Sequence, residues 1–200
     1  MTAPTAWSGP GVQRRARQIT DLLQPKHVLI GGLTGIGLAA TGTLAGAAWG
    51  LFASVFAGVI PAAYIEHQRK RGRWGDRHVV DRAQRRPIFL VILGSIACAT
   101  AVMLLAGAPH DVLLSMIALW AMTVGLLTVN DGGCWKISVD AAVASAVVTM
   151  LTVVGSPWWA LAYAGVALVC WTRVALGFHT LTQTMAGTAM GLATALLWVV

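Results

Sequence analysis

Charged residues are confined to a few short stretches of this chain, and their placement limits its fold more than any other feature. Of the 14 lysines and arginines, 12 lie between Arg14 and Arg86, and only Lys136 and Arg173 follow. Charged residues make up 10% of the chain, against roughly 25% in ordinary soluble domains. So few charges cannot cover a globule in water. The sequence therefore predicts an all-α integral membrane protein, a bundle of apolar helices.

Long apolar runs divide the sequence into about six to seven expected transmembrane helices. Residues 28–65 are almost uncharged and exceed one span of about 20 residues, so we expect a helical hairpin that turns near residues 46–50. The other expected spans are residues 88–107, 112–129, 141–154, 158–172 and 180–200. The last run contains Gly187 and Gly191 in a Gly-x-x-x-Gly spacing, which lets helices approach closely.

The polar segments between these runs predict the orientation in the membrane. Because each hairpin crosses twice, the amino terminus and residues 67–87, 130–138 and 177–179 should share one side. The opposite turns carry one acid, Asp111, and no lysine or arginine. The positive-inside rule then places the polar side in the cytoplasm, which predicts a multi-pass protein of the cytoplasmic membrane.

The first 27 residues form a polar segment of their own. Its cations are interpreted as orientation signals that lie outside any candidate site: Arg14, Arg15, Arg17 and Lys26. Residues 12–23 have the pattern of a short amphipathic helix on the membrane surface. We therefore divide the chain into an interfacial segment, residues 1–27, and a transmembrane domain, residues 28–200.

An arginine-rich segment, residues 76–87, ends the most polar stretch. If it is helical, Arg82 and Arg85 share a face, with Arg86 close by. Guanidinium groups bind phosphate oxygens in a bidentate fashion, so this face is a candidate phosphate clamp. The alternative is a basic loop that sets orientation and touches anionic lipid head groups.

Two later polar groups lie against the predicted spans. Ionisable residues there are costly and usually have a partner or a task. Lys136, Ser138 and Asp140 precede or begin one helix, where the serine hydroxyl and the helix amides could hold an oxyanion. Arg173 closes the next helix, and His179 precedes the last one.

This series of motifs resembles the type 2 phosphatidic acid phosphatase (PAP2) superfamily of membrane lipid phosphatases. The three family motifs are Lys-x6-Arg-Pro, Pro-Ser-Gly-His and Ser-Arg-x5-His-x3-Asp. Here the first ends in Arg86 and a proline, the second retains Ser138, and the third reads Thr172-Arg173, five residues, then His179. The resemblance covers roughly residues 76–187 and is strongest to the small actinobacterial-type branch.

The resemblance implies a PAP2-like fold and a membrane phosphohydrolase that acts on a lipid phosphate or diphosphate, isoprenoid or phosphatidyl. His179 would attack phosphorus and form a phosphohistidine. Asp140 stands where the family has the histidine that protonates the leaving group, and Gln183 stands where it has the aspartate that orients the nucleophile. The residues implied as the phosphate grip are Arg82, Arg86, Lys136, Ser138 and Arg173.

Other interpretations remain open because Val79, Asp140 and Gln183 depart from the family motifs. One is a PAP2-like protein that binds a lipid phosphate without hydrolysing it. Another is an enzyme that eliminates diphosphate from, or cyclises, an isoprenyl diphosphate, although no DDxxD motif is present. A transporter is disfavoured because no interrupted-helix repeat is evident. We expect no metal and no other cofactor, and membrane lipids rather than nucleic acid as partners.

Overall fold

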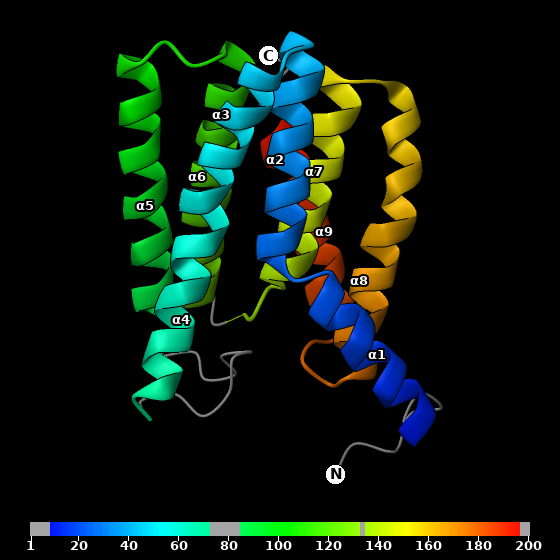
Figure 1. The fold of residues 1–200 in the computed structure, drawn as a ribbon. Helices are drawn as coiled ribbons and strands as arrows, with labels where there is room; N and C mark the ends of the chain where they lie inside the picture. Colours follow the sequence, from blue (N-terminus) through cyan, green and yellow to red (C-terminus); the bar gives the residue numbers. More distant parts are fainter. Residues whose placement is uncertain (1–8, 73–84, 133–134, 197–200) are drawn as a thin grey trace.

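The computed structural model describes residues 9–72, 85–132 and 135–196, and within these ranges the chain is helical with no strand (Figure 1). The elements in order are α1 (Pro10–Leu22), α2 (Pro25–Thr41), α3 (Leu44–Ser54), a π-helical turn η1 (Val55–Val59), α4 (Ile60–Lys70), α5 (Arg85–Leu105), α6 (His110–Asp131), α7 (Val139–Val154), a 3-10 stretch η2 (Pro157–Ala162), α8 (Tyr163–Ala175) and α9 (Leu181–Leu196).

Four helical stretches are long and apolar enough to cross a membrane: Leu44–Lys70, Arg86–Leu105, His110–Asp131 and Pro157–Ala175. The all-helical, membrane-type bundle is therefore confirmed, whereas the count of six to seven spans stays a prediction. Helix α7 is apolar but has only 16 residues, fewer than the roughly 20 that a span needs. Residues 141–151 of α7 are all buried by the surrounding helices, so α7 has little surface left to face lipid.

The first hairpin turns earlier than the glycines at 46–50 suggested, so that prediction is wrong. Helix α2 ends at Gly42, whose φ of 65° is left-handed and suits glycine. Thr43 then caps α3, because its hydroxyl accepts a hydrogen bond from the Gly46 amide at 3.2 Å. Gly46 and Gly50 lie inside α3, where a Cβ would collide with backbone carbonyls of α2. These glycines allow close packing of α3 on α2 rather than forming the turn.

The Gly-x-x-x-Gly pair of the last helix has the role that its spacing indicates. A Cβ at Gly187 would collide with the carbonyl oxygen of Ser138, and one at Gly191 with that of Ala142. The two glycines therefore bring α9 into backbone contact with the first turns of α7.

We predict that Gly191→Leu disrupts the bundle, because a leucine side chain has no room against the α7 backbone. Overpacking typically costs about 1–3 kcal/mol, and contact with rigid backbone puts this substitution at the upper end. Thermal unfolding of the purified protein in detergent measures the loss. Gly94→Leu is the matched control, since Gly94 is exposed on α5 and a Cβ there meets nothing within 4 Å. Equal stability of the two variants would contradict the packing.

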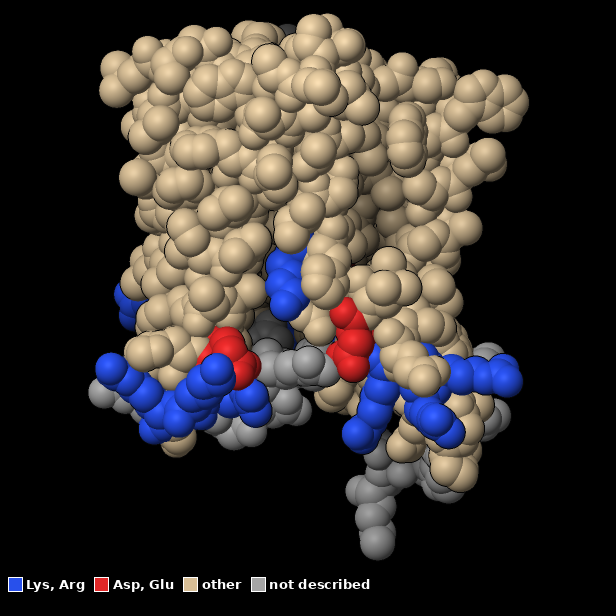
Figure 2. Space-filling model, in the orientation of Figure 1, with Lys and Arg blue, Asp and Glu red and all other residues tan. Residues whose placement is uncertain are grey.

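Six helix ends that the predicted topology places on one side of the membrane lie together at one end of the bundle. The carboxyl ends of α4, α6 and α8 lie there with the amino ends of α5, α7 and α9 (Figure 1). Lys, Arg, Asp and Glu side chains gather at this polar end, and the visible face above it carries almost none (Figure 2). The expected amphipathic helix is present as α1, which packs on α8 and buries Ala16. Its contact with the membrane surface stays a prediction.

Candidate functional site

A cavity of about 380 Å³ lies at the polar end, and its described walls come from α2, η1, α4, α5, α6, α7, α8 and the connection between α8 and α9. Most of its lining is apolar. The ionisable side chains on its wall are Lys26, Glu66, Lys136, Asp140, Arg173 and His179. The sequence predicted four of these as site residues: Lys136, Asp140, Arg173 and His179. Their convergence from separate helices makes this cavity the candidate site.

A buried ion pair forms the centre of the polar wall. Arg173 ends α8 and is 2% exposed, and its Nη2 lies 3.0 Å from Oδ1 of Asp140, in the first turn of α7. An arginine at a helix carboxyl end and an aspartate at a helix amino end both interact favourably with the helix dipoles. The guanidinium also stacks over the Phe178 ring, 6.0 Å from its centroid. Arg173 is thus held in place by the Asp140 carboxylate and the Phe178 ring.

Hydrogen bonds fix the orientation and the tautomer of His179. Its Nδ1 lies 3.3 Å from Oε1 of Gln183 and 3.3 Å from the carbonyl oxygen of Lys136. Both of these oxygens are acceptors, since the Gln183 Oε1 also accepts from the Thr180 amide at 3.0 Å. In the neutral ring the proton therefore lies on Nδ1, facing these two oxygens, and the lone pair lies on Nε2.

The turn between α8 and α9 holds Arg173 and His179 as one unit. Gly177 adopts a φ of 70° after α8, and the amides of Phe178 and His179 both donate to the Arg173 carbonyl, at 3.0 and 3.2 Å. Lys136 crosses from the start of α7 and donates through Nζ to the Phe178 carbonyl at 3.2 Å. The histidine, the arginine and the lysine are consequently fixed relative to one another.

Ser138 and Gln183 support this wall but are not among the residues that line the cavity. Ser138 is fully buried and caps α7, since its Oγ accepts from the Ala141 amide at 3.4 Å. Its own amide donates to the Gln183 carbonyl at 3.2 Å. The prediction that Ser138 begins a helix is confirmed. A direct contact with phosphate would require its hydroxyl to leave the cap.

The arginine cluster of the first motif is not brought to the cavity by the described residues. Arg86 is exposed, and its Nε lies 3.7 Å from Oδ2 of Asp131, at the end of α6. Arg82 and the helical face expected within residues 76–87 lie outside the described residues, apart from the start of α5. The clamp formed by these arginines therefore stays a prediction.

Two ionisable lining residues were not predicted from the sequence. Lys26 lies in the first turn of α2 and Glu66 lies in α4, and both line the cavity. The interpretation of Lys26 as a cation outside any site is wrong. Its position at the amino end of a predicted span is only a weak signal of a site. The packing of α2 against α7, which the sequence does not show, brings Lys26 to the cavity wall.

Among the described residues, no three His, Cys, Asp or Glu side chains gather as a metal site would require. The described ionisable groups on the cavity wall are one imidazole, one guanidinium, two ammonium groups and two carboxylates. Comparison with protein-family models, with curated proteins and with solved structures found no match to this chain.

Proposed function

We propose that this protein is a membrane phosphohydrolase that removes phosphate or diphosphate from an isoprenoid or phosphatidyl lipid through a phosphohistidine. One observation carries the proposal: His179 is held by two acceptors at Nδ1, on the same short turn as the buried guanidinium of Arg173. A nucleophile oriented by a second group, beside a fixed cation, is the arrangement that phosphoryl transfer needs. The resemblance to PAP2 motifs supports the same roles.

In this proposal Nε2 of His179 attacks phosphorus, the N–P bond forms, and the bond from phosphorus to the lipid oxygen breaks. The leaving oxygen takes a proton from solvent water. A second water molecule then attacks phosphorus, the N–P bond breaks, phosphate is released and the Nε2 lone pair is restored. Arg173 and Lys136 stabilise the charge on the phosphoryl oxygens. The polar end of the bundle faces the cytoplasm in this proposal, and the protein resides in the cytoplasmic membrane.

The ion pair between Arg173 and Asp140 favours a second candidate, a protein that binds a lipid phosphate without hydrolysing it. The Asp140 carboxylate lies 3.0 Å from the Arg173 guanidinium that would bind the phosphate. A carboxylate in such a pair has no proton to give to a leaving group. Binding would then exchange one anion for another, and turnover would lack its acid.

Asp140→His separates the two candidates. A histidine has an ordinary pKa of about 6.5 and can donate a proton near neutral pH, and its introduction removes the competing carboxylate from Arg173. If the protein is a hydrolase, phosphate release should rise at least roughly tenfold, the low side of the range for general acid catalysis. Release is measured with purified protein and a panel of lipid phosphates, without added metal.

The binding candidate predicts tighter lipid phosphate binding by Asp140→His and no phosphate release. Asp111→His is the matched control, because Asp111 also lies in the first turn of its helix but at the opposite end of the bundle. It should alter neither quantity. If Asp140→His also leaves both release and binding unchanged, Asp140 is not part of the site, and the binding candidate, which rests on its ion pair, loses its support.

A further inference from the structure

The cavity continues from its polar wall into a long apolar compartment. Its apolar lining includes Ala57, Pro61 and Ile65 from η1 and α4, Ile88, Phe89, Ile92 and Ile96 from α5, and Leu119, Met122 and Leu126 from α6. Apolar walls would not stabilise an inorganic anion or a small polar phosphate. Their extent indicates that the ligand carries an apolar chain.

The spacing of the lining residues gives the depth of this compartment. On α5 the lining runs from Ile88 to Ile96, and on α6 from Leu126 to Leu119. A helix rises about 1.5 Å per residue, so these intervals correspond to depths of about 12 Å and about 10 Å. The apolar lining therefore spans about two helical turns.

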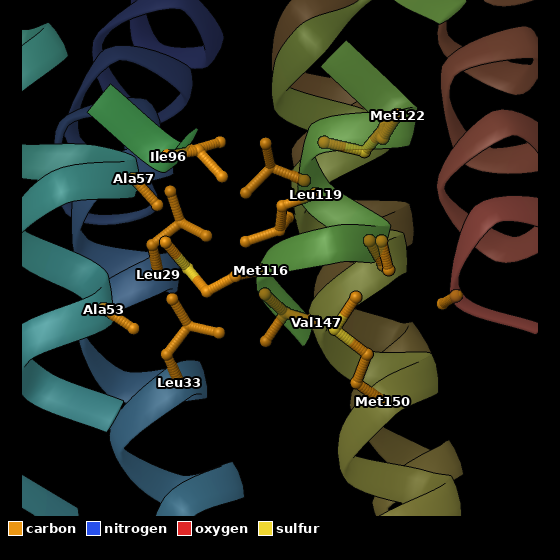
Figure 3. Close-up of a cluster of buried hydrophobic side chains, with 14 of the residues drawn as sticks. Leu29, Leu33, Ala53, Ala57, Ile96, Met116, Leu119, Met122, Val147 and Met150 are labelled. Carbon is orange, nitrogen blue, oxygen red and sulfur yellow. The ribbon is translucent and has the colours of Figure 1, made fainter. Parts of the chain in front are cut away.

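Packed side chains close the compartment at its inner end. Leu33, Ala53 and Met116 are fully buried, and each lies about one helical turn beyond a residue of the lining. Figure 3 shows these side chains pointing toward one another between α2, α3 and α6, directly beyond Leu29 and Leu119. The hydrophobic core thus forms a floor, and a ligand chain cannot extend past it without displacing core side chains.

The π-helical turn η1 shapes one wall of the compartment. Ala57 and Gly58 of this turn line the cavity, and Gly58 lets the turn approach α2 closely, since a Cβ there would meet Lys26 and Leu29 at 3.2 Å. The Ser95 hydroxyl of α5 donates to the Phe56 carbonyl at 2.7 Å, which binds the wall to α5. Single π-helical turns within α-helices are rare and are frequent at functional sites.

We infer that the cavity binds a single-chain lipid phosphate, with its phosphate on Arg173 and one alkyl or prenyl tail of limited length in the apolar compartment. An extended chain advances about 1.3 Å per carbon for single bonds of about 1.5 Å, so the tail that fits has about ten carbons. A volume of about 380 Å³ lies near the lower end of the roughly 300–1,000 Å³ typical of ligand sites. Two long acyl chains therefore do not fit. The identity of the head group rests on the proposed function.

A series of alkyl monophosphates tests this inference by binding alone. We expect affinity to rise about fourfold per added carbon up to about ten carbons and then to level off. Binding is measured with the purified protein in nanodiscs of zwitterionic lipid, and partition into empty nanodiscs is subtracted. A diacyl phosphatidate of long chain length should bind at least roughly tenfold more weakly than the ten-carbon phosphate.

Substitutions on the inner walls should move the length limit in opposite directions. Ala57→Leu fills the inner end, so affinity for the ten-carbon phosphate should fall at least roughly tenfold while that for a four-carbon phosphate stays unchanged. Leu119→Ala should extend the limit by about three carbons, which is the size of the space it opens. Ala97→Leu, on the exposed face of α5, is the matched control and should change nothing.

Affinity that rises steadily past about ten carbons, or a diacyl lipid that binds as tightly as the single-chain ligand, would overturn the inference. So would a length limit that neither Ala57→Leu nor Leu119→Ala moves. The outcome is separable from the proposed function. A length limit without phosphate release supports the inference and refutes the hydrolase, whereas release without a length limit does the reverse.

Discussion

His179→Ala should abolish phosphate release, with a loss of at least about 10³-fold in turnover. The reason is that the phosphoryl group must be carried by a nitrogen whose lone pair is directed by hydrogen bonds at the other ring nitrogen, as Gln183 and the Lys136 carbonyl provide for His179. The loss should be the same in the Asp140→His background, because a better acid cannot replace a missing nucleophile. Phosphate release and acid-labile labelling of the protein by radioactive lipid phosphate are the two measurements.

The control for this substitution is His110→Ala. His110 begins α6 at the end of the bundle opposite the cavity, and its side chain is 81% exposed. It should retain full turnover and full labelling. Residual release by His179→Ala within about tenfold of the unsubstituted protein would show that phosphoryl transfer does not pass through His179.

Asp140→Ala should lower the free energy of unfolding by about 3 kcal/mol, because it leaves the buried guanidinium of Arg173 without its carboxylate. Inorganic phosphate should restore part of that stability, since an anion can take the vacated position. The double substitution Asp140→Ala, Arg173→Leu should be more stable than Asp140→Ala alone, because it also removes the buried cation. Denaturant or thermal unfolding with and without phosphate measures each effect.

A second ion pair at the same end of the bundle provides the comparison. Arg86 and Asp131 approach to 3.7 Å, but their side chains are 72% and 40% exposed. Asp131→Ala should therefore cost less than about 1 kcal/mol, with no recovery on adding phosphate. Similar losses for Asp131→Ala and Asp140→Ala would mean that the Asp140 pair is solvated.

The parts of the fold that follow from local pattern were predictable from the sequence. The helix from 88 to 107 and the one from 112 to 129 correspond closely to α5 and α6, because long apolar runs between polar turns leave few alternatives. The first hairpin turn was not predictable in this way. Glycines at 42, 46 and 50 look alike in the sequence, and only the fit of α3 against α2 makes one of them a turn and the others contact points.

The site was predictable where its residues are close in the sequence. Arg173 and His179 share one short turn, and their joint position on the cavity wall follows from that turn. The pairing of Asp140 with Arg173 and the place of Lys26 depend on how helices pack that are distant in the sequence. The depth of the cavity depends likewise on side chains of α5 and α6, whose spacing alone looks the same in lipid-facing and ligand-facing helices.

The contact of Gly187 with the Ser138 carbonyl couples the alignment of α7 and α9 to the relative position of Asp140 and His179. Asp140 moves with α7, whereas His179 is attached directly to the start of α9, so a slide of one helix along the other changes the separation between carboxylate and imidazole. If the protein is the phosphohydrolase proposed above, enlarging Gly187 should lower phosphate release although this glycine lies outside the cavity lining. A screen for lost release should then recover packing residues of α9 together with Asp140 and His179.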